Sequence, residues 1–295
     1  MLVQANDLKD KITAMMLKVA AKTVSREEGA LYLNDLMRRS MDKSKLQRVL
    51  LELGQSPPSL VLAKTVFHVI SLTNNVAFVE ILEAGLKHKD EEVCIFSAEG
   101  LARYKNDRAR DMLLRHLVDD LYHIRKTSAK VLVTWWGSEG IRLVVAHGLH
   151  HHDLYIRDTA ASVLADAGAP GLSALLEVIE SDNADAIQSA IEALIPFWGR
   201  LKKEHVPKLI RALETAIISR QSTTIIAILR LLALLKGLLS GFEEYLAILL
   251  NETYEPVRQA ASQTLKAVGT ERAHMLLSDG RTLTTRTGFL TDDPG

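Results

Sequence analysis

The sequence predicts an all-α protein: a right-handed α–α superhelix, or solenoid, of about six to seven helix pairs. Glycine or asparagine returns every 31 residues through the middle of the chain, at Asn75, Asn106, Gly137, Gly168 and Gly199. Both residue types tolerate the left-handed backbone that ends a helix and opens a tight turn. Between these positions lie segments with helical apolar periodicity, and each segment resembles the next. A helix-ending residue on a fixed period indicates one copied and stacked unit.

Residues 90–119 show the unit. We expect a first helix over residues 92–104, with Val93, Phe96 and Leu101 on its apolar stripe. Asn106 interrupts this helix, and a second helix follows over residues 108–118. Residues in the structural role of Val93 return at a spacing of 31 or 32, at Ile124, Ile156 and Ile187. The first and second helices of each unit therefore form a pair.

An acidic residue followed by an arginine recurs near the start of three first helices. The acids are Asp120, Asp153 and Glu252, and the arginines are Arg125, Arg157 and Arg258. The acid suits a helix N-cap or first turn, where backbone N–H groups lack partners. We expect the arginine, one turn later, to reach the acid of a neighbouring repeat. Such a ladder would fix the stacking register of the repeats.

The pattern of acid, Val/Ile-Arg, spaced Ala, Gly and a Leu-rich second helix resembles the HEAT repeat. The short period is similar to that of the HEAT-like family named after phycobilisome lyases, and the resemblance covers about residues 60–277. It implies an α-solenoid of helix pairs. Between Gly199 and Gly237 the interval stretches to 38 residues, which departs from the pattern.

We expect three segments along the chain: an N-terminal helical capping region at 1–58, the repeat solenoid at 59–278 and a polar, disordered tail at 279–295. In the capping region the helices fall outside the 31-residue phase. Asn6 or Asp7 can cap the first helix, the capping box at Ser25 opens the second, and Asp42 opens the third.

Composition limits the classes of function. Lys plus Arg number 36, equal to Asp plus Glu, so no global field attracts nucleic acid or an anionic membrane, and we do not expect a nucleic-acid partner. The single cysteine, Cys94, fits a reducing compartment. The apolar segment 223–239 contains Arg230 and Lys236 and favours a buried helix over a membrane span. We therefore expect a soluble, cytoplasmic protein.

Histidines are the first candidates for chemistry. His147 and His150 lie three residues apart, a spacing that suits a transition metal, and His116 lies 31 residues before His147. The alternative is a set of solvated turn residues, which we favour. The HEAT-like deoxyhypusine hydroxylases hold two irons through His-Glu pairs, and no His-Glu dipeptide occurs in this chain. We expect no metal, no cofactor and no catalytic residue; Cys94 suits small core filler.

Aromatic residues gather at the end of the first helices. Tyr104, Trp135 and Phe197 share one repeat position, and Lys105, Trp136 and Trp198 share the next. These rings either wedge between repeats or form an anchor patch for a partner, since Trp and Tyr are common in interface hot spots.

The sequence favours a non-enzymatic scaffold that binds a protein or peptide through a concave groove built by the second helices. The expected partner-binding residues are Asp111, Arg115, Arg142, His147, Glu177, Lys208 and Arg211, with Trp136 and Trp198 at the edge. Two alternatives stay open. The first, implied by the family resemblance, is a lyase-like or chaperone role toward a tetrapyrrole (bilin). The second is nucleic-acid binding by a HEAT-like solenoid, which the local basic clusters keep open.

Overall fold

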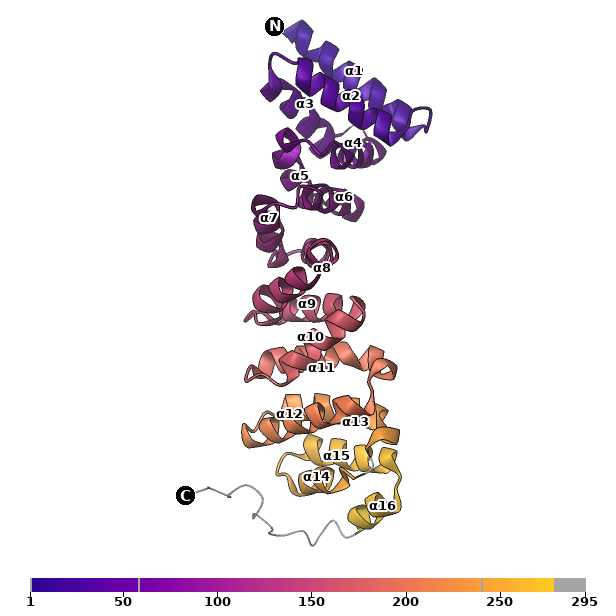
Figure 1. Cartoon of the computed structure of the whole chain (residues 1–295), viewed down its shortest axis with the longest axis vertical. Coiled ribbons are helices and arrows are strands. Elements are labelled where there is room, and N and C mark those ends of the chain that lie inside the picture. Colours follow the sequence, from indigo (N-terminus) through magenta and orange to yellow (C-terminus); the bar gives the residue numbers. More distant parts are fainter. Residues whose placement is uncertain (1, 58, 240, 279–295) are drawn as a thin grey trace. The chain divides into compact units, whose positions relative to one another are not determined.

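The fold is taken from a computed structural model that describes residues 2–57, 59–239 and 241–278 (Figure 1). Every regular element in these residues is helical, and none is a strand. The predicted all-α fold class, a solenoid of stacked helix pairs, is thereby confirmed. The tail expected at 279–295 lies outside the described residues.

The chain divides into two compact units, one up to Gly148 and one from Leu149. The division falls within the span expected to be one solenoid, between two repeats. The boundaries expected near residues 58 and 278 stay predictions. Each unit is described by itself below.

Unit 1 consists of four helix pairs and one additional helix. Its elements are α1 (Leu2–Ala20), α2 (Arg26–Arg39), α3 (Lys43–Gln55), α4 (Leu60–Leu72), η1 (Val76–Phe78), α5 (Val79–Leu86), α6 (Glu91–Ala102), α7 (Asp107–Leu117), α8 (Tyr122–Val144) and the π-helical η2 (Val145–Leu149). A kink at Gly137 divides α8 into two halves, which act as the first and second helix of one pair. First helices α2, α4, α6 and α8 pack in succession, and so do second helices α3, α5 and α7.

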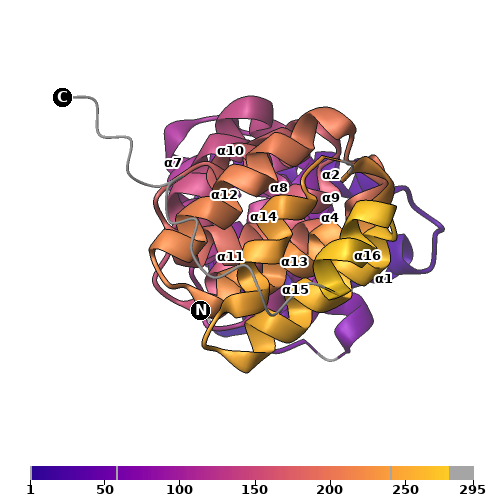
Figure 2. The same cartoon turned by 90° about the horizontal axis from the view of Figure 1, so that it is seen from below.

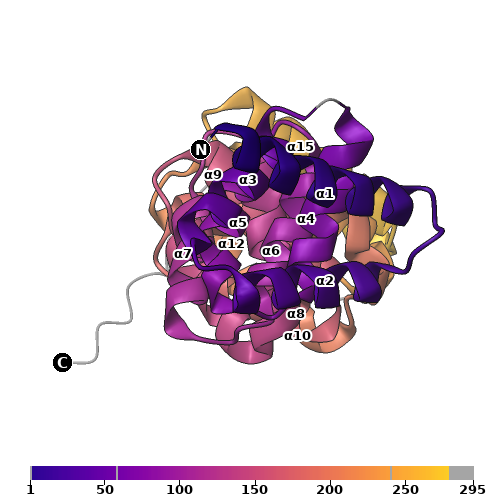
Figure 3. The ribbon, with the colours of Figure 1, turned by 90° about the horizontal axis from the view of Figure 1, so that it is seen from above.

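The N-terminal helices pack in phase with the repeats, which differs from our expectation. Helices α2 and α3 contact α4 and α5 as one more pair, and α1 packs on α2, α3 and α4 (Figure 3). The capping box at Ser25 is present, with Glu28 as its second member, and Asp42 caps α3. Helix α1 begins at Leu2, earlier than the expected cap at Asn6 or Asp7.

Unit 2 also consists of four pairs. Its elements are α9 (Leu154–Asp166), α10 (Ala169–Ile179), α11 (Ala184–Leu194), η3 (Ile195–Arg200), η4 (Lys203–His205), α12 (Val206–Ile218), α13 (Ser222–Leu234), η5 (Lys236–Leu238), α14 (Glu243–Ile248), η6 (Leu249–Asn251), α15 (Glu255–Val268) and α16 (Glu271–Ser278). First helices α9, α11, α13 and α15 pack in succession; among the second helices, α10 packs on α12 and α14 on α16 (Figure 2). In the described residues from Leu60 onward the two units thus hold seven pairs, within the predicted range.

A fully buried alanine lies within several of the first helices. These alanines are Ala98 and Ala129 in unit 1, and Ala160, Ala190 and Ala261 in unit 2, all with 0% exposure. Small side chains at such positions allow neighbouring helices to pack closely. A fully buried leucine follows each alanine by three or four residues and fills the core between the two helices of a pair.

The expected hydrophobic helix over 223–239 corresponds to α13 and η5, and α13 buries Ile225, Ile228 and Leu232. Among the described residues, no helix combines the length and apolar character needed to cross a membrane.

The turns within repeats use two constructions. At Gly137 and Gly168 the glycine itself takes positive φ, at 55° and 76°. In the two earlier turns the residue before the asparagine takes positive φ: Asn74 (48°) precedes Asn75, and Lys105 (46°) precedes Asn106. The two asparagines instead have φ of −115° and cap the next helix through their side chains. Our expectation that Asn75 and Asn106 are left-handed was therefore wrong; Asn is also a preferred N-cap.

The recurring arginines close the turns between repeats rather than forming the predicted ladder. Arg125 Nη1 donates to the carbonyl oxygens of Asp119 and Asp120, at 2.8 Å each. Arg157 donates to the carbonyls six and five residues before it, at 3.0 and 2.7 Å, and Arg258 does the same at 2.6 and 2.8 Å. Arg157 additionally lies 3.6 Å from Asp185 of the next repeat, as the ladder requires.

The expected acidic caps differ among the three turns. Asp153 caps α9 through its side chain. Helices α8 and α15 begin without a side-chain cap, so Asp120 and Glu252 are not the N-caps that we predicted.

We predict different outcomes for alanine at two glycines of unit 2. A Cβ at Gly168 or Gly199 would meet no atom within 4 Å, but only Gly168 has positive φ. Gly168→Ala should lower the free energy of unfolding by about 1–3 kcal/mol because of backbone strain. Gly199→Ala should change it by less than about 0.5 kcal/mol. Urea unfolding followed by circular dichroism measures both; equal effects would contradict the assignment.

Candidate functional site

The exposed side of the second helices carries the predicted binding residues of unit 1. Asp111 and Arg115 lie on α7, and Arg142 lies on the second half of α8. His147 follows in η2. All four are exposed, while α7 buries Met112, Leu113 and Leu117 on its opposite stripe.

In unit 2 the predicted residues also lie on second helices. Glu177 is exposed on α10, and Lys208 and Arg211 lie on the neighbouring helix α12. Trp136 and Trp198 lie elsewhere, at the turn edge where first helices end. The predicted set is thus divided between two kinds of surface in each unit.

Ion pairs join second helices of neighbouring repeats in unit 1. Arg115 of α7 lies 2.9 Å from Glu83 of α5, and Arg108 lies 3.5 Å from Glu80. In the other direction Arg110 lies 3.3 Å from Glu139, in the second half of α8. These contacts hold the exposed charges of three successive second helices in one register.

The same arrangement recurs in unit 2. Glu180 accepts from Lys208 at 2.6 Å and lies 2.9 Å from Arg211, so one carboxylate at the end of α10 holds two cations of α12. The Lys208 hydrogen bond lowers the pKa of Glu180 below its usual value. Glu244 of α14 likewise pairs with Arg272 of α16.

The sequence reasoning missed these carboxylates, although a signal was present. The acid and base of a pair stand 28 to 32 residues apart, close to the repeat period. Scanning second helices for opposite charges at that spacing would have found Glu83 and Glu180.

The histidines lie in unlike environments. His116 is buried and its Nδ1 lies 3.3 Å from Asp119, whereas His147 is exposed in η2. His150 lies 3.1 Å from the Asn183 amide, and His151 accepts from the backbone N–H of Asp153. Across the described part of the chain, no three His, Cys, Asp or Glu side chains cluster as metal ligands would.

The turn edge of each unit carries aromatic rings with cations on them. In unit 1 Arg103 and Lys105 each lie 5.9 Å from the ring centre of Trp135. In unit 2 Arg200 lies 4.7 Å from that of Phe197, and Trp198 is 46% exposed. The other rings at this edge are partly buried, as rings wedged between repeats would be, and the anchor-patch role stays a prediction.

Tyr104, which is partly buried, holds the turn edge of unit 1 in place through a hydrogen bond. Its hydroxyl donates to the Asn75 carbonyl at 2.8 Å, and burial raises its pKa to about 12.

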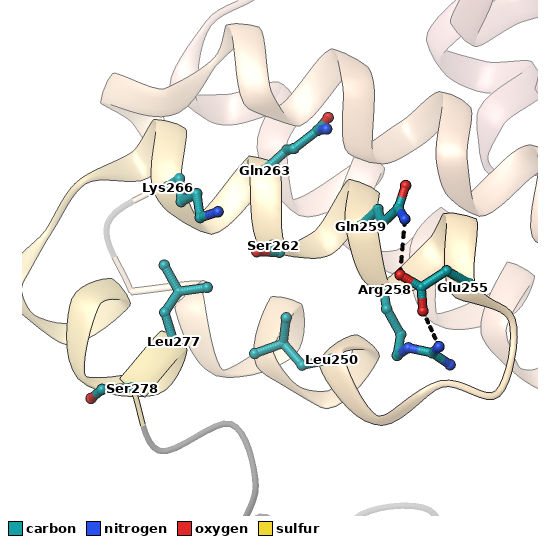
Figure 4. Close-up of a pocket in the computed structure, with 9 residues that line it drawn as sticks. All are labelled: Leu250, Glu255, Arg258, Gln259, Ser262, Gln263, Lys266, Leu277 and Ser278. Atoms are coloured by element: carbon teal, nitrogen blue, oxygen red, sulfur yellow. Dashed lines mark hydrogen bonds and ion pairs between the residues drawn. The ribbon is translucent and has the colours of Figure 1, made fainter.

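Two open hollows lie at first helices. In unit 1 a hollow of about 720 Å³ lies beside the turn between α1 and α2, where His68 stacks on Phe96 at 4.0 Å between ring centres. In unit 2 a hollow of about 460 Å³ lies between α15 and α16 (Figure 4). Its polar wall includes Glu255, which pairs with Arg258 and accepts from Gln259. Both hollows mix opposite charges.

Cys94 is fully buried on α6. Burial raises the pKa of its thiol to about 12, so the nucleophilic thiolate is scarce at neutral pH. The thiol therefore behaves as core filler.

The fold that these helix pairs define is a HEAT-like α-solenoid. No protein-family model matches the chain, and no curated protein is significantly similar to it. The narrower resemblance to the short phycobilisome-lyase type stays a prediction.

Several solved structures are similar to it. Human deoxyhypusine hydroxylase in complex with glycerol is 13% identical, with a TM-score of 0.34, and the match covers 91% of this chain and 99% of that one. Kap121p bound to Ste12p is 12% identical, with a TM-score of 0.40, covering 88% of this chain and 33% of that one. A designed armadillo repeat protein is 16% identical, with a TM-score of 0.28, covering 75% and 99%.

We predict that Cys94 resists thiol reagents in the folded protein. At pH 8 the raised pKa leaves about one thiolate in 10⁴, against roughly one in four for an unperturbed thiol. Ellman's reagent should react at least about a thousandfold more slowly than in urea-unfolded protein. The control variant Met41→Cys, at a fully exposed position, should react at once. Fast labelling of folded wild type would contradict the burial.

We predict a pH-dependent stabilisation by Glu180. Because its pKa is lowered in the fold, its contribution is present above about pH 4.3 and is lost as pH falls through the lowered pKa. Glu180→Gln should therefore lower Tm at pH 7, and the difference should vanish once the pH is below the lowered pKa of Glu180. Glu177→Gln, on the same helix but without an ion pair across repeats, should match wild type at both pH values. A difference that persists at low pH would point to packing instead.

Proposed function

We propose that this chain is a non-enzymatic scaffold that binds a protein or peptide on the exposed faces of its second helices. The observation that carries the proposal is the set of ion pairs between second helices of neighbouring repeats, exemplified by Arg115 with Glu83 and by Lys208 with Glu180. These pairs hold long charged side chains in a fixed array. A fixed array supports binding because less side-chain entropy is lost when a partner docks.

Some charges on this face stay available to a partner. Arg142 is exposed and, among the described residues, has no ion pair with a carboxylate. Arg211 keeps 66% of its side chain exposed although it contacts Glu180. Complementary charges across an interface give specificity and faster association, which suits a face of mixed sign.

The test compares proteins captured from a cell extract by immobilised wild type and variants, with mass spectrometry as the readout. In unit 1, Arg142→Glu should lose a partner that wild type retains, because the reversed charge repels the complementary acid. Lys130→Glu is the matched control: Lys130 is exposed in the same unit, on the first-helix half of α8. It should retain the partner.

For unit 2 the triple variant Glu180→Lys, Lys208→Glu and Arg211→Glu keeps both ion pairs within the protein while inverting their direction. Tm should stay near that of wild type, and capture of the partner should fall at least about tenfold, since one lost charge-assisted contact is worth about that much. Unchanged capture by both the triple variant and Arg142→Glu would refute binding through the second helices.

A further inference from the structure

Two cations converge on one indole ring at the turn edge of unit 1. The Arg103 guanidinium and the Lys105 ammonium each lie 5.9 Å from the Trp135 ring centre. The cations come from the turn after α6 and the ring from α8, so the cluster joins neighbouring repeats. Among the described residues neither cation is paired with a carboxylate. Their positive charges are held in place but not neutralised.

The backbone at Lys105 is unfavourable for lysine. Its φ of 46° is left-handed, a conformation that costs little only for Gly and, to a lesser degree, Asn. Asn74 occupies the same turn position one repeat earlier, with φ 48°. The fold alone would therefore favour asparagine at position 105. Strained non-glycine residues cluster at binding sites, where the side chain is needed despite its backbone.

The side chains around the two cations are partly or fully accessible to solvent. Trp135 and Trp136 are half-buried, while Arg103 and Lys105 are exposed. Tyr104, between the two cations, anchors the turn through its 2.8 Å hydrogen bond to the Asn75 carbonyl. Rigid indoles beside cations have the composition of interface hot spots.

We propose that Arg103, Lys105, Trp135 and Trp136 bind an acidic peptide segment of a partner protein. Its carboxylates would meet the two cations, and a neighbouring aromatic or apolar side chain would pack on the indoles. The positive patch consists of two cations on one ring, which suits the few carboxylates of a short acidic peptide better than a continuing chain of phosphates. The inference concerns the turn edge and does not rest on binding through the second helices.

The test uses a fluorescein-labelled peptide with the sequence Gly-Asp-Tyr-Asp-Gly, whose affinity for the protein is measured by fluorescence anisotropy at low salt. Lys105→Asn removes the ammonium while supplying the residue that the chain itself uses at position 74. We expect this variant to be at least as stable as wild type and to bind the peptide about threefold more weakly. Adding Arg103→Gln should bring the loss to about tenfold.

Three controls make the experiment decisive. A peptide with Asn in place of both Asp residues should bind much more weakly than the acidic one. Lys130→Gln, at an exposed position on the first-helix half of α8, should bind the acidic peptide as wild type does. Equal binding of the two peptides, unchanged binding by the double variant, or tighter binding of a thymidine oligonucleotide would each overturn the proposal.

Discussion

The close packing of successive first helices is the contact on which the rest of each unit depends. A single helix pair cannot bury its apolar stripe on both sides, so each pair needs a neighbour. The fully buried alanines, Ala129 in unit 1 and Ala160 in unit 2 among them, remove side-chain bulk where the helices meet. The spacing between repeats follows from this contact. Given that spacing, the carboxylates and cations of adjacent second helices fall within reach of one another.

The two surfaces of a unit differ in how their charges are arranged. On the second helices, acids and bases of neighbouring repeats are linked, as Glu180 is to two cations of α12. At the turn edge of unit 1, the cations lie on aromatic rings and keep their charge. The second helices therefore present positive and negative charges held in place by ion pairs, whereas the turn edge of unit 1 presents a compact positive patch. These differences follow from the helix geometry, because side chains on stacked helices face their counterparts while those in turns face solvent.

The period of Gly and Asn was sufficient to predict the fold, because these residues mark the turn within successive copies whether they end one helix or cap the next. The caps at Ser25 and Asp42 were also predictable, since their hydrogen bonds are local. The role of Asn75 was not, because asparagine suits both a left-handed residue and an N-cap, and the two positions are adjacent in the chain. The backbone angles at Asn74 and Asn75 decide between them.

The candidate site was predicted only in outline. Helical periodicity placed Arg115 and Lys208 on exposed faces, but the partners that hold them belong to other repeats and depend on the register of stacking. The 31-residue spacing of His116 and His147 did not predict their surroundings. His116 is buried in regular α7, whereas His147 is exposed in the π-helical η2.

The arginines that bind their own turn carbonyls have a consequence for how such a chain can grow. Arg125, Arg157 and Arg258 each donate to the carbonyl groups five and six residues before them, so these three junctions between repeats are closed by residues from one continuous stretch. A duplicated stretch of coding sequence would therefore carry its own finished junction wherever it was inserted. A single duplication can then add a whole repeat. The charges on the second helices of the new copy can diversify afterwards.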